Sequence, residues 1–549
     1  MIARRTALVV AIVTVALPAA AAAQAPADSG FRPAPDGFSF PNYGGEGEPN
    51  LGSAEMRRLF GDAVCGSEPA DDCALTPPAR AWMDRANESM DGGHCMGLSV
   101  AALRFFTGAA SPGPFGAPTT FGLKFQTPIA REIAYGFTFQ LLDSVGDGGI
   151  DGTPKEILAA LRRELPNKDE TYTIAIFKRE FVDGHAITPY AIEDRAGGKS
   201  AIKVYDNNFP NQNREVIIDT VADTFQYNTA VNPQADVDLY EGDAASGTFF
   251  LYPTTPGQGV QPCTFCKVVG GPQDPPAVPL PPAPPSPKPT PKPAVDAVEV
   301  ASTGSLRRHA RVAVSDGRRT IGFPKGPFVN TFGSAAEAIR LIEQRGNDIK
   351  REPYYRVPAR RAYTITLANR TRRGLSGEGV RITGPAFDAS VRGLRLAKGQ
   401  TVKIRVSAVG DQLSFVSNRV LDTSAISIGR TEPGADHGFV LRRDSMLPRR
   451  KRLVFAMNPG TDKLQIEGAN GTYDLLARRV DEKGDQVLLR ENIRTGALND
   501  TVTFDYGGWD GSPGSHISLE GESGKERIIE SQVAPGTDPE RAEEKVVRE

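Results

Sequence analysis

A proline-rich run near the middle of the chain limits what the chain can fold into. Residues 272–293 carry proline at about every second position, with Lys288 and Lys292 between the prolines. Such a run cannot build a core and adopts polyproline II, which extends by about 3.1 Å per residue. We therefore expect a linker over residues 269–297, with one folded unit before it and another after it. This division suits a chain of 549 residues.

The first residues predict export. The segment Met1 to Arg5 is basic, Leu8 to Leu17 is apolar, and small residues follow from Ala19 to Ala23. This order is typical of a secretory signal peptide, which we expect to cover residues 1–23. No other segment is long and apolar enough to span a bilayer. The mature chain is therefore expected to be secreted, extracellular or associated with the cell surface, without a transmembrane segment.

The charge balance indicates no nucleic-acid partner, because the formal net charge is -2. One basic stretch stands out in the second half, formed by Arg442-Arg443 and by Arg449 to Arg452. A solvated face is the ordinary interpretation of such a stretch. The alternative is binding of an anionic cell-surface polymer through the C-terminal domain.

The five cysteines divide into two close pairs and one remainder. Cysteines of an exported protein usually form disulfides, and the local pairing of Cys65 with Cys73 and of Cys263 with Cys266 is the simplest of three. A zinc site formed by these four is the less favoured alternative, so we expect no metal and no other cofactor. Cys95 is left unpaired, and an unpaired thiol in an oxidising compartment suggests a function.

Cys95 stands at a position where a thiol becomes reactive. It follows Gly92, Gly93 and His94 and begins an apolar run with helical spacing that extends to Phe106. A helix that is apolar nearly all round is buried. Its first residue lies among unpaired backbone N–H groups at the positive end of the helix dipole, which favours thiolate over thiol. A buried structural cysteine is the alternative.

A nucleophilic thiol needs a base, and the base needs an orienting acceptor. Of the two histidines before the linker, His94 adjoins Cys95, and adjacent side chains at a helix start rarely face each other. His185 begins a predicted strand and is the plausible base. If the next predicted strand pairs with it, Asp206 returns beside His185 as the orienter, and Asn207 is the neighbouring alternative.

These residues are similar in order to the papain-like cysteine peptidase superfamily. A cysteine at the head of a central helix, then Gly-His-Ala on a strand, then Asp/Asn at the end of the next strand resembles most the bacterial double-glycine and bacteriocin-processing branch, over residues 79–252. The resemblance implies that Cys95 is the nucleophile, His185 the base and Asp206 the orienter. It also implies hydrolysis of an amide in a peptide or protein substrate through a thioester. Transglutaminase-like acyltransferases share the same order and are an alternative.

One departure from the papain-like pattern concerns the oxyanion. The pattern places a glutamine six residues before the cysteine, but Ser89 stands there. Asn87 and the backbone N–H of Cys95 are the candidate substitutes. Without such a donor the transition state of acyl transfer is poorly stabilised. A non-catalytic surface or adhesion protein, with a degenerate papain-like domain that only binds, is therefore a further alternative.

Helical spacing precedes period-two spacing before the linker, which indicates an α+β fold with helices packed on an antiparallel sheet. With the resemblance, this predicts a papain-like domain over residues 55–268, after an extended arm over residues 24–54. The predicted helices cover residues 54–60, 79–90, 95–108, 128–145 and 154–165, and the predicted strands cover residues 171–178, 184–193, 201–205, 214–219 and 247–252.

Short alternating runs dominate the sequence after the linker and predict an all-β, sandwich-like domain over residues 298–518. One helix is expected within it, because Ser334 and Glu337 form a capping box, apolar residues follow, and Gly346 ends the run. Residues 519–549 are charged and poor in apolar side chains, so we expect this tail to be disordered.

Overall fold

The structure is a computed structural model that describes residues 27–530 apart from short gaps. The gaps are residues 46, 229–238, 267–295, 305–307, 343–351, 423–424, 444–446, 459, 469–470, 495–500, 513 and 522–525. The predicted signal peptide and nearly all of the predicted linker lie outside the described residues, so both stay predictions.

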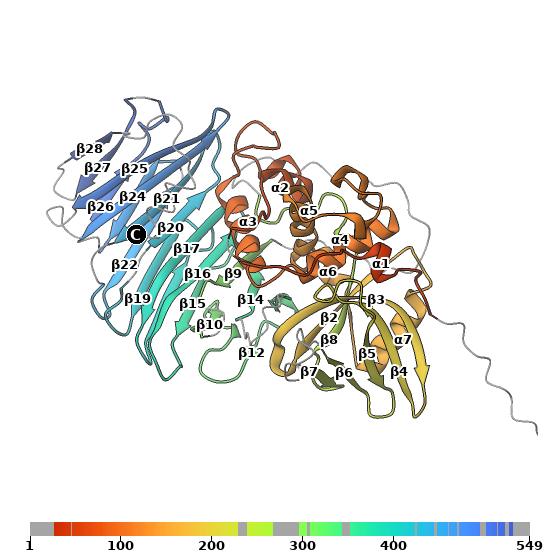
Figure 1. The fold of residues 1–549 in the computed structure, drawn as a ribbon. Coiled ribbons are helices and arrows are strands. Elements are labelled where there is room, and N and C mark those ends of the chain that lie inside the picture. The colour runs from red at the N-terminus through yellow and green to blue at the C-terminus, as the bar shows by residue number, and fades with distance from the viewer. Residues whose placement is uncertain are drawn as a thin grey trace, which may run out of the picture.

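The α-helices of the described residues all lie in the first third of the chain, and α4 and α7 pack against opposite faces of the N-terminal sheet (Figure 1). They are α1 (Pro33–Asp36), α2 (Ser53–Phe60), α3 (Pro77–Met90), α4 (Cys95–Thr107), α5 (Thr127–Phe137), α6 (Asp143–Asp147) and α7 (Pro154–Glu164). The 3-10 helices are η1 (Asp62–Val64), η2 (Gly113–Phe115), η3 (Thr120–Gly122), η4 (Thr138–Leu141), η5 (Arg179–Phe181), η6 (Thr255–Gly257) and η7 (Gly333–Ala335).

The N-terminal sheet is antiparallel and has eight strands in the order β1-β8-β2-β3-β4-β5-β6-β7. In that order the strands are β1 (Ile150–Asp151), β8 (Phe249–Pro253), β2 (Tyr172–Lys178), β3 (Val182–Arg195), β4 (Lys199–Tyr205), β5 (Arg214–Asp219), β6 (Thr224–Asn228) and β7 (Leu239–Asp243). Because β3 pairs with β4 in a register that sets Thr188 opposite Tyr205, the residue after β4 returns towards the start of β3.

Two further antiparallel sheets follow residue 296, with eleven and nine strands. The first contains β12 (Val329–Asn330), β11 (Thr320–Gly322), β10 (Arg311–Ser315), β15 (Tyr363–Ala368), β18 (Thr401–Val406), β19 (Gln412–Ser417), β22 (Arg452–Asn458), β23 (Lys463–Glu467), β26 (Thr501–Asp505), β27 (His516–Gly521) and β28 (Glu526–Glu530). The second contains β13 (Glu337–Ile339), β14 (Tyr354–Pro358), β9 (Ala297–Ser302), β16 (Leu375–Gly384), β17 (Phe387–Leu396), β20 (Ala425–Arg430), β21 (Asp436–Arg443), β24 (Thr472–Asp481) and β25 (Gly484–Arg494). Apolar side chains of both sheets form one continuous core.

The predicted fold class, an α+β papain-like domain joined to a β-sandwich-like domain, is wrong. The described chain is mostly β, with three large antiparallel sheets and only a small helical region near the N-terminus. Local spacing identified single strands, but it could not show how many of them join into one sheet, because sheet size depends on pairing between distant segments.

The helix predicted from Ser334 is also wrong. Residues 333–335 form only the 3-10 turn η7, and Glu337 begins strand β13. β13 pairs with β14, so the sheet satisfies the backbone groups that a helix would have satisfied, and tertiary pairing overrides helix propensity. In the predicted disordered tail, β27 extends to Gly521 and β28 covers 526–530, whereas residues after 530 lie outside the described part.

Helix α4 lies in the interior between α5 and β3, and one glycine makes this possible. A Cβ added to Gly97 would lie 2.1 Å from the backbone oxygen of Ile133 on α5. The two helices therefore approach more closely than any side chain at position 97 would allow. This contact fixes the start of α4, and with it Cys95, against the rest of the N-terminal half.

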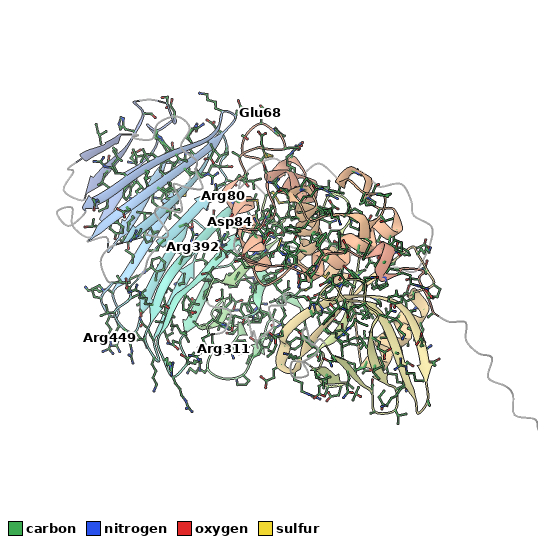
Figure 2. All side chains as sticks on the ribbon, viewed as in Figure 1. Glu68, Arg80, Asp84, Arg311, Arg392 and Arg449 are labelled. Carbon is green, nitrogen blue, oxygen red and sulfur yellow. A yellow bond between two sulfur atoms is a disulfide. The ribbon has the colours of Figure 1, made fainter. Side chains whose placement is uncertain are left out.

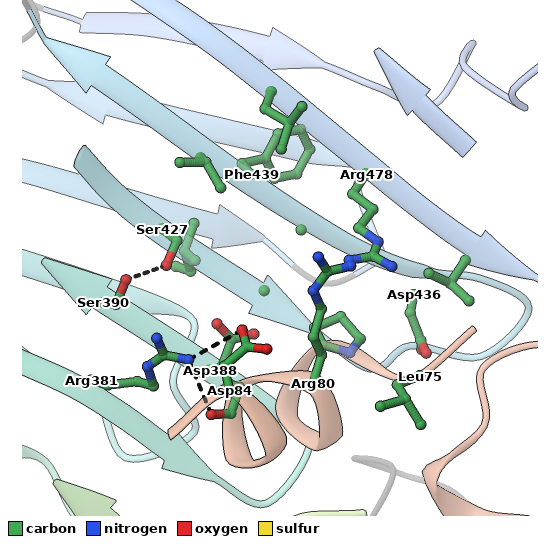
Figure 3. A pocket seen from close by; sticks show the side chains of 18 of the residues that line it. Leu75, Arg80, Asp84, Arg381, Asp388, Ser390, Ser427, Asp436, Phe439 and Arg478 are labelled. Carbon is green, nitrogen blue, oxygen red and sulfur yellow. Dashed lines mark hydrogen bonds and ion pairs between the residues drawn. The ribbon is translucent and has the colours of Figure 1, made fainter. Parts of the chain in front are cut away.

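The two halves of the chain share an extensive interface. Helix α3 packs on β16, β17, β20 and β21 of the nine-stranded sheet (Figure 1). Arg381 of β16 bonds to Asp84 at 3.2 Å (Figure 3) and to Glu88 at 2.6 Å. Arg85 of α3 and Glu299 of β9 form a buried ion pair at 2.7 Å. The two halves therefore share buried contacts, and one apolar cluster contains residues of both.

Within the described residues, no helix combines the length and the apolar character that crossing a bilayer requires.

Candidate active site

Cys95 is the first residue of α4, and the structure encloses it completely. Gly93, with a φ of 146°, turns the chain into the helix, and His94 is the N-cap residue. The exposed fraction of Cys95 is 0%. The thiol therefore lies at the positive end of a buried helix, which is the location predicted from the sequence.

His185 and Asp206 form a buried hydrogen-bonded pair. His185 Nε2 lies 2.8 Å from Asp206 Oδ1, and both side chains are fully buried. The other oxygen of Asp206 accepts a hydrogen bond from the hydroxyl of Tyr227 on β6, and the backbone N–H of Asn208 donates to Oδ1 at 2.8 Å. The carboxylate is thus held on three sides, and its orientation towards His185 is fixed.

The remaining ring nitrogen of His185 is left for Cys95. His185 Nδ1 is buried and has no hydrogen-bond partner among the described residues. Burial lowers the pKa of the imidazole, but the Asp206 carboxylate and the adjacent Cys95 thiol outweigh burial and raise this pKa to about 10. Burial raises the pKa of Asp206, but the same imidazole, together with Tyr227 and the Asn208 N–H, lowers it on balance. Both shifts favour the charged forms of the pair, imidazolium and carboxylate.

Two other candidates from the sequence have different partners. The Asn207 side chain donates to the backbone oxygen of Cys95 and to that of Ala186, both at 3.0 Å, so it ties the start of α4 to β3 rather than orienting His185. The Asn87 amide accepts from the backbone N–H of Leu51 at 3.0 Å and donates to its carbonyl at 3.1 Å. Asn87 thus anchors the N-terminal arm through Leu51.

Gln140 on η4 was not predicted from the sequence, and it shares a hydrogen-bond partner with Cys95. Its Nε2 donates at 3.4 Å to the backbone carbonyl oxygen of Ile342, a residue of the second half. The Cys95 Sγ lies 4.0 Å from the same oxygen. One carbonyl oxygen therefore faces both the thiol and a side-chain amide. Nothing in the sequence near Gln140 marks it, because its partner follows 202 residues later.

The other four cysteines form the two expected disulfides. The Cα atoms of Cys65 and Cys73 are 5.7 Å apart, and those of Cys263 and Cys266 are 5.4 Å apart. Cys95 is the free cysteine of the described residues. The predicted pairing, which leaves Cys95 without a disulfide partner, is thus confirmed.

Two other regions of the surface stand apart from this site. A cavity of about 70 Å³ lies between α3 and the nine-stranded sheet, lined in part by Arg80, Asp388 and Arg478 (Figure 3). The basic turn Arg449 to Arg452 between β21 and β22 is exposed, and Figure 2 shows Arg449 at an outer edge of the C-terminal sheets. Neither region contains Cys95 or its partners.

Comparison with protein-family models, with curated proteins and with solved structures finds no match for this chain. Its function therefore has to be argued from the geometry of the site itself.

Proposed function

We propose that this chain is a cysteine-dependent amide hydrolase that acts on peptides or proteins. The observation that carries the proposal is the buried series Tyr227, Asp206, His185, which ends beside the thiol of Cys95 at a helix start. Buried polar groups are costly unless they are paired, so an aligned series of them beside a free thiol supports a chemical role. The order of these residues along the chain, which resembles papain-like cysteine peptidases, supports the same chemistry.

The proposed reaction has two steps. The Cys95 thiolate attacks the amide carbon and forms a C–S bond, while His185 gives its proton to the leaving amine as the C–N bond breaks. Water then attacks the thioester and loses a proton to His185, the C–S bond breaks, and the thiolate–imidazolium pair is restored. Asp206 holds the imidazole in the required orientation and stabilises its charged form without itself moving a proton.

Gln140 takes the role of oxyanion donor in this proposal, in place of the expected Asn87. Its Nε2 already donates to a carbonyl oxygen that lies against the thiol. A donor aimed at the oxygen of the reacting carbonyl stabilises the charge that develops there, and losing one such donor costs about 10²–10³ in rate.

Two observations support a secreted location for this hydrolase. The chain has two disulfides, and disulfides form and persist in oxidising compartments. The predicted signal peptide is consistent with them.

The decisive experiment detects the charged pair without requiring substrate access. The ultraviolet absorption band of a thiolate is measured at neutral pH in the intact chain and in the Cys95→Ala, His185→Ala and Asn207→Ala variants. We expect a thiolate band that is absent from Cys95→Ala and strongly reduced in His185→Ala, because the imidazolium stabilises the thiolate. A cysteine that stays a thiol, or a band indifferent to His185, would contradict the proposal. Asn207→Ala tests the alternative orienter next to Asp206, and it should reduce the band less than His185→Ala does.

The protonation state of His185 gives a pH-dependent prediction. Because the pKa of its imidazole is raised to about 10, the ring should remain protonated through neutral pH and lose its proton only in the alkaline range. Nitrogen NMR of labelled histidine should show this titration. In Asp206→Asn the pKa of His185 should fall, because burial is then opposed only by Cys95. A ring that titrates near 6.5 in the intact chain would contradict the proposed pair.

A further inference from the structure

The candidate site is closed, and a segment of the second half closes it. Cys95, His185 and Asp206 each have an exposed fraction of 0%. Ile342 is equally buried and belongs to the same apolar cluster as Cys95, although 247 residues separate them. An external substrate therefore cannot reach the thiol while Ile342 is in place.

Gln140 holds Ile342 by its backbone. Its Oε1 accepts the Ile342 N–H at 2.7 Å, and its Nε2 donates to the Ile342 carbonyl at 3.4 Å. One side-chain amide thus pairs with both polar groups of one residue, as a neighbouring strand would. In recognition of this kind, hydrogen bonds to the peptide backbone provide affinity, and the pocket around the side chain provides selectivity.

The segment leading to Ile342 lies along an open cleft. Residues 337–340 form one wall of a cleft of about 500 Å³, and its other walls include Phe181 of η5 and residues 249–252 of β8. The guanidinium of Arg340 lies 4.4 Å from the centre of the Phe181 ring. Ile339 and Leu341 are partly buried against the same cluster as Cys95. The chain leaves the paired strand β13 at Ile339, and three residues later Ile342 presents its carbonyl oxygen to the thiol.

We propose that the buried space beside Cys95 that Ile342 fills is a peptide-binding groove, selective for a bulky aliphatic residue at the carbonyl presented to Cys95, and that the segment ending at Ile342 occupies it as an internal ligand. The inference rests on the proposed function, since it takes Cys95 as the nucleophile. It adds the substrate class, which is an unfolded peptide with an Ile-like side chain before the cleaved bond. It also implies that substrate must displace the internal segment before it can bind.

The first test opens the groove in the full chain. Hydrolysis of a fluorogenic dipeptide amide ending in Leu-Ile is measured for the wild type and for the Ile342→Asp, Ile342→Gly and Ile342→Val variants. The Asp variant places a carboxylate in an apolar pocket, and the Gly variant removes the anchoring side chain without adding charge. We expect both to hydrolyse at least about tenfold faster than the wild type, because a larger fraction of molecules is competent to bind. Ile342→Val keeps the anchor and should match the wild type.

The second test returns the ligand in trans. A synthetic peptide with the sequence of residues 337–342, Glu-Ala-Ile-Arg-Leu-Ile, carrying a C-terminal amide, should inhibit the open variants competitively. The same peptide with aspartate in place of its last isoleucine should not inhibit. A substrate ending in Leu-Asp should be hydrolysed at least about tenfold more slowly than the Leu-Ile substrate.

The outcomes separate this inference from the proposed function. A wild type as fast as both open variants, or open variants that ignore the peptide, would overturn the internal ligand. Open variants that show a thiolate band but hydrolyse no peptide would overturn the groove. Absence of the thiolate band, with no hydrolysis in any variant, would instead overturn the proposed function. Adding Cys95→Ala to an open variant should abolish hydrolysis, which shows that Cys95 carries it.

Discussion

Each half of the molecule contains a histidine paired with a buried carboxylate, and the two pairs differ in their surroundings. His185 and Asp206 lie beside a free thiol, with Nδ1 of the histidine unpaired by any hydrogen bond among the described residues. His309 lies 3.3 Å from Glu352, whose other oxygen accepts from the backbone N–H of Val312 at 3.0 Å. In the second pair, the Glu352 carboxylate accepts a backbone N–H of strand β10 in the eleven-stranded sheet. A histidine–carboxylate pair becomes a candidate site only where a nucleophile adjoins it.

The largest expected effect is that of Asp206→Asn. The substitution leaves His185 buried without its carboxylate, and breaking a buried charge pair costs about 3–5 kcal/mol of the free energy of unfolding. Denaturant unfolding of the wild type and the variant checks this. A loss below about 1 kcal/mol would mean that the pair contributes no more than a surface ion pair.

The pH dependence of that loss has a definite sign. The raised pKa of His185 stabilises the fold fully below 6.5, and this stabilisation disappears as the pH rises through about 10. The lowered pKa of Asp206 acts in the acid range, where its stabilisation is lost as the carboxylate becomes protonated. The difference between wild type and Asp206→Asn should therefore be largest in mildly acidic solution.

Glu352→Gln is the matched change in the second half, and its expected effect is smaller. The glutamine keeps the shape and one acceptor oxygen, so the loss is that of charge-assisted hydrogen bonds, about 1.5–3 kcal/mol. The thiolate band of Cys95 should not change. If Glu352→Gln weakened that band as strongly as His185→Ala, the distinction between the two pairs would fail.

The smallest effects come from two tyrosines that occupy equivalent positions. Tyr227 donates to Asp206, and Tyr355 donates to Glu352 at 2.8 Å. Replacing either by phenylalanine should cost about 1 kcal/mol, because one buried hydrogen bond is lost. Only Tyr227→Phe should change the pKa of His185, since Tyr227 donates to the carboxylate that pairs with that imidazole. Denaturant unfolding and histidine NMR of both variants measure the two quantities.

The sequence predicted those parts of the structure that depend on local spacing. The predicted strand 171–178 appears as β2 (Tyr172–Lys178), and the predicted pairing of the strands after it brings Asp206 beside His185. The catalytic roles of these residues and of Cys95 stay predictions. What the spacing identified was a cysteine without a partner and a histidine that could reach it.

The remaining features depend on contacts between distant segments. Gln140 and Ile342 are 202 residues apart, and no local pattern connects them. Tyr227 lies on β6, a strand that the sequence did not predict. Asn87 carries the expected amide but uses it on Leu51 of the arm. The fold class was wrong for a similar reason, because the extent of the three sheets is set by pairing across the chain.

The separation of Cys95 from Ile342 also determines when the site closes. A ribosome makes residues 27–266 before it makes Ile342, and N-terminal units generally fold first. The segment that covers Cys95 is therefore the last part of the site to arrive. If the first half folds before Ile342 is made, the thiol stays open to oxidants and mixed-disulfide partners until the second half folds against the first.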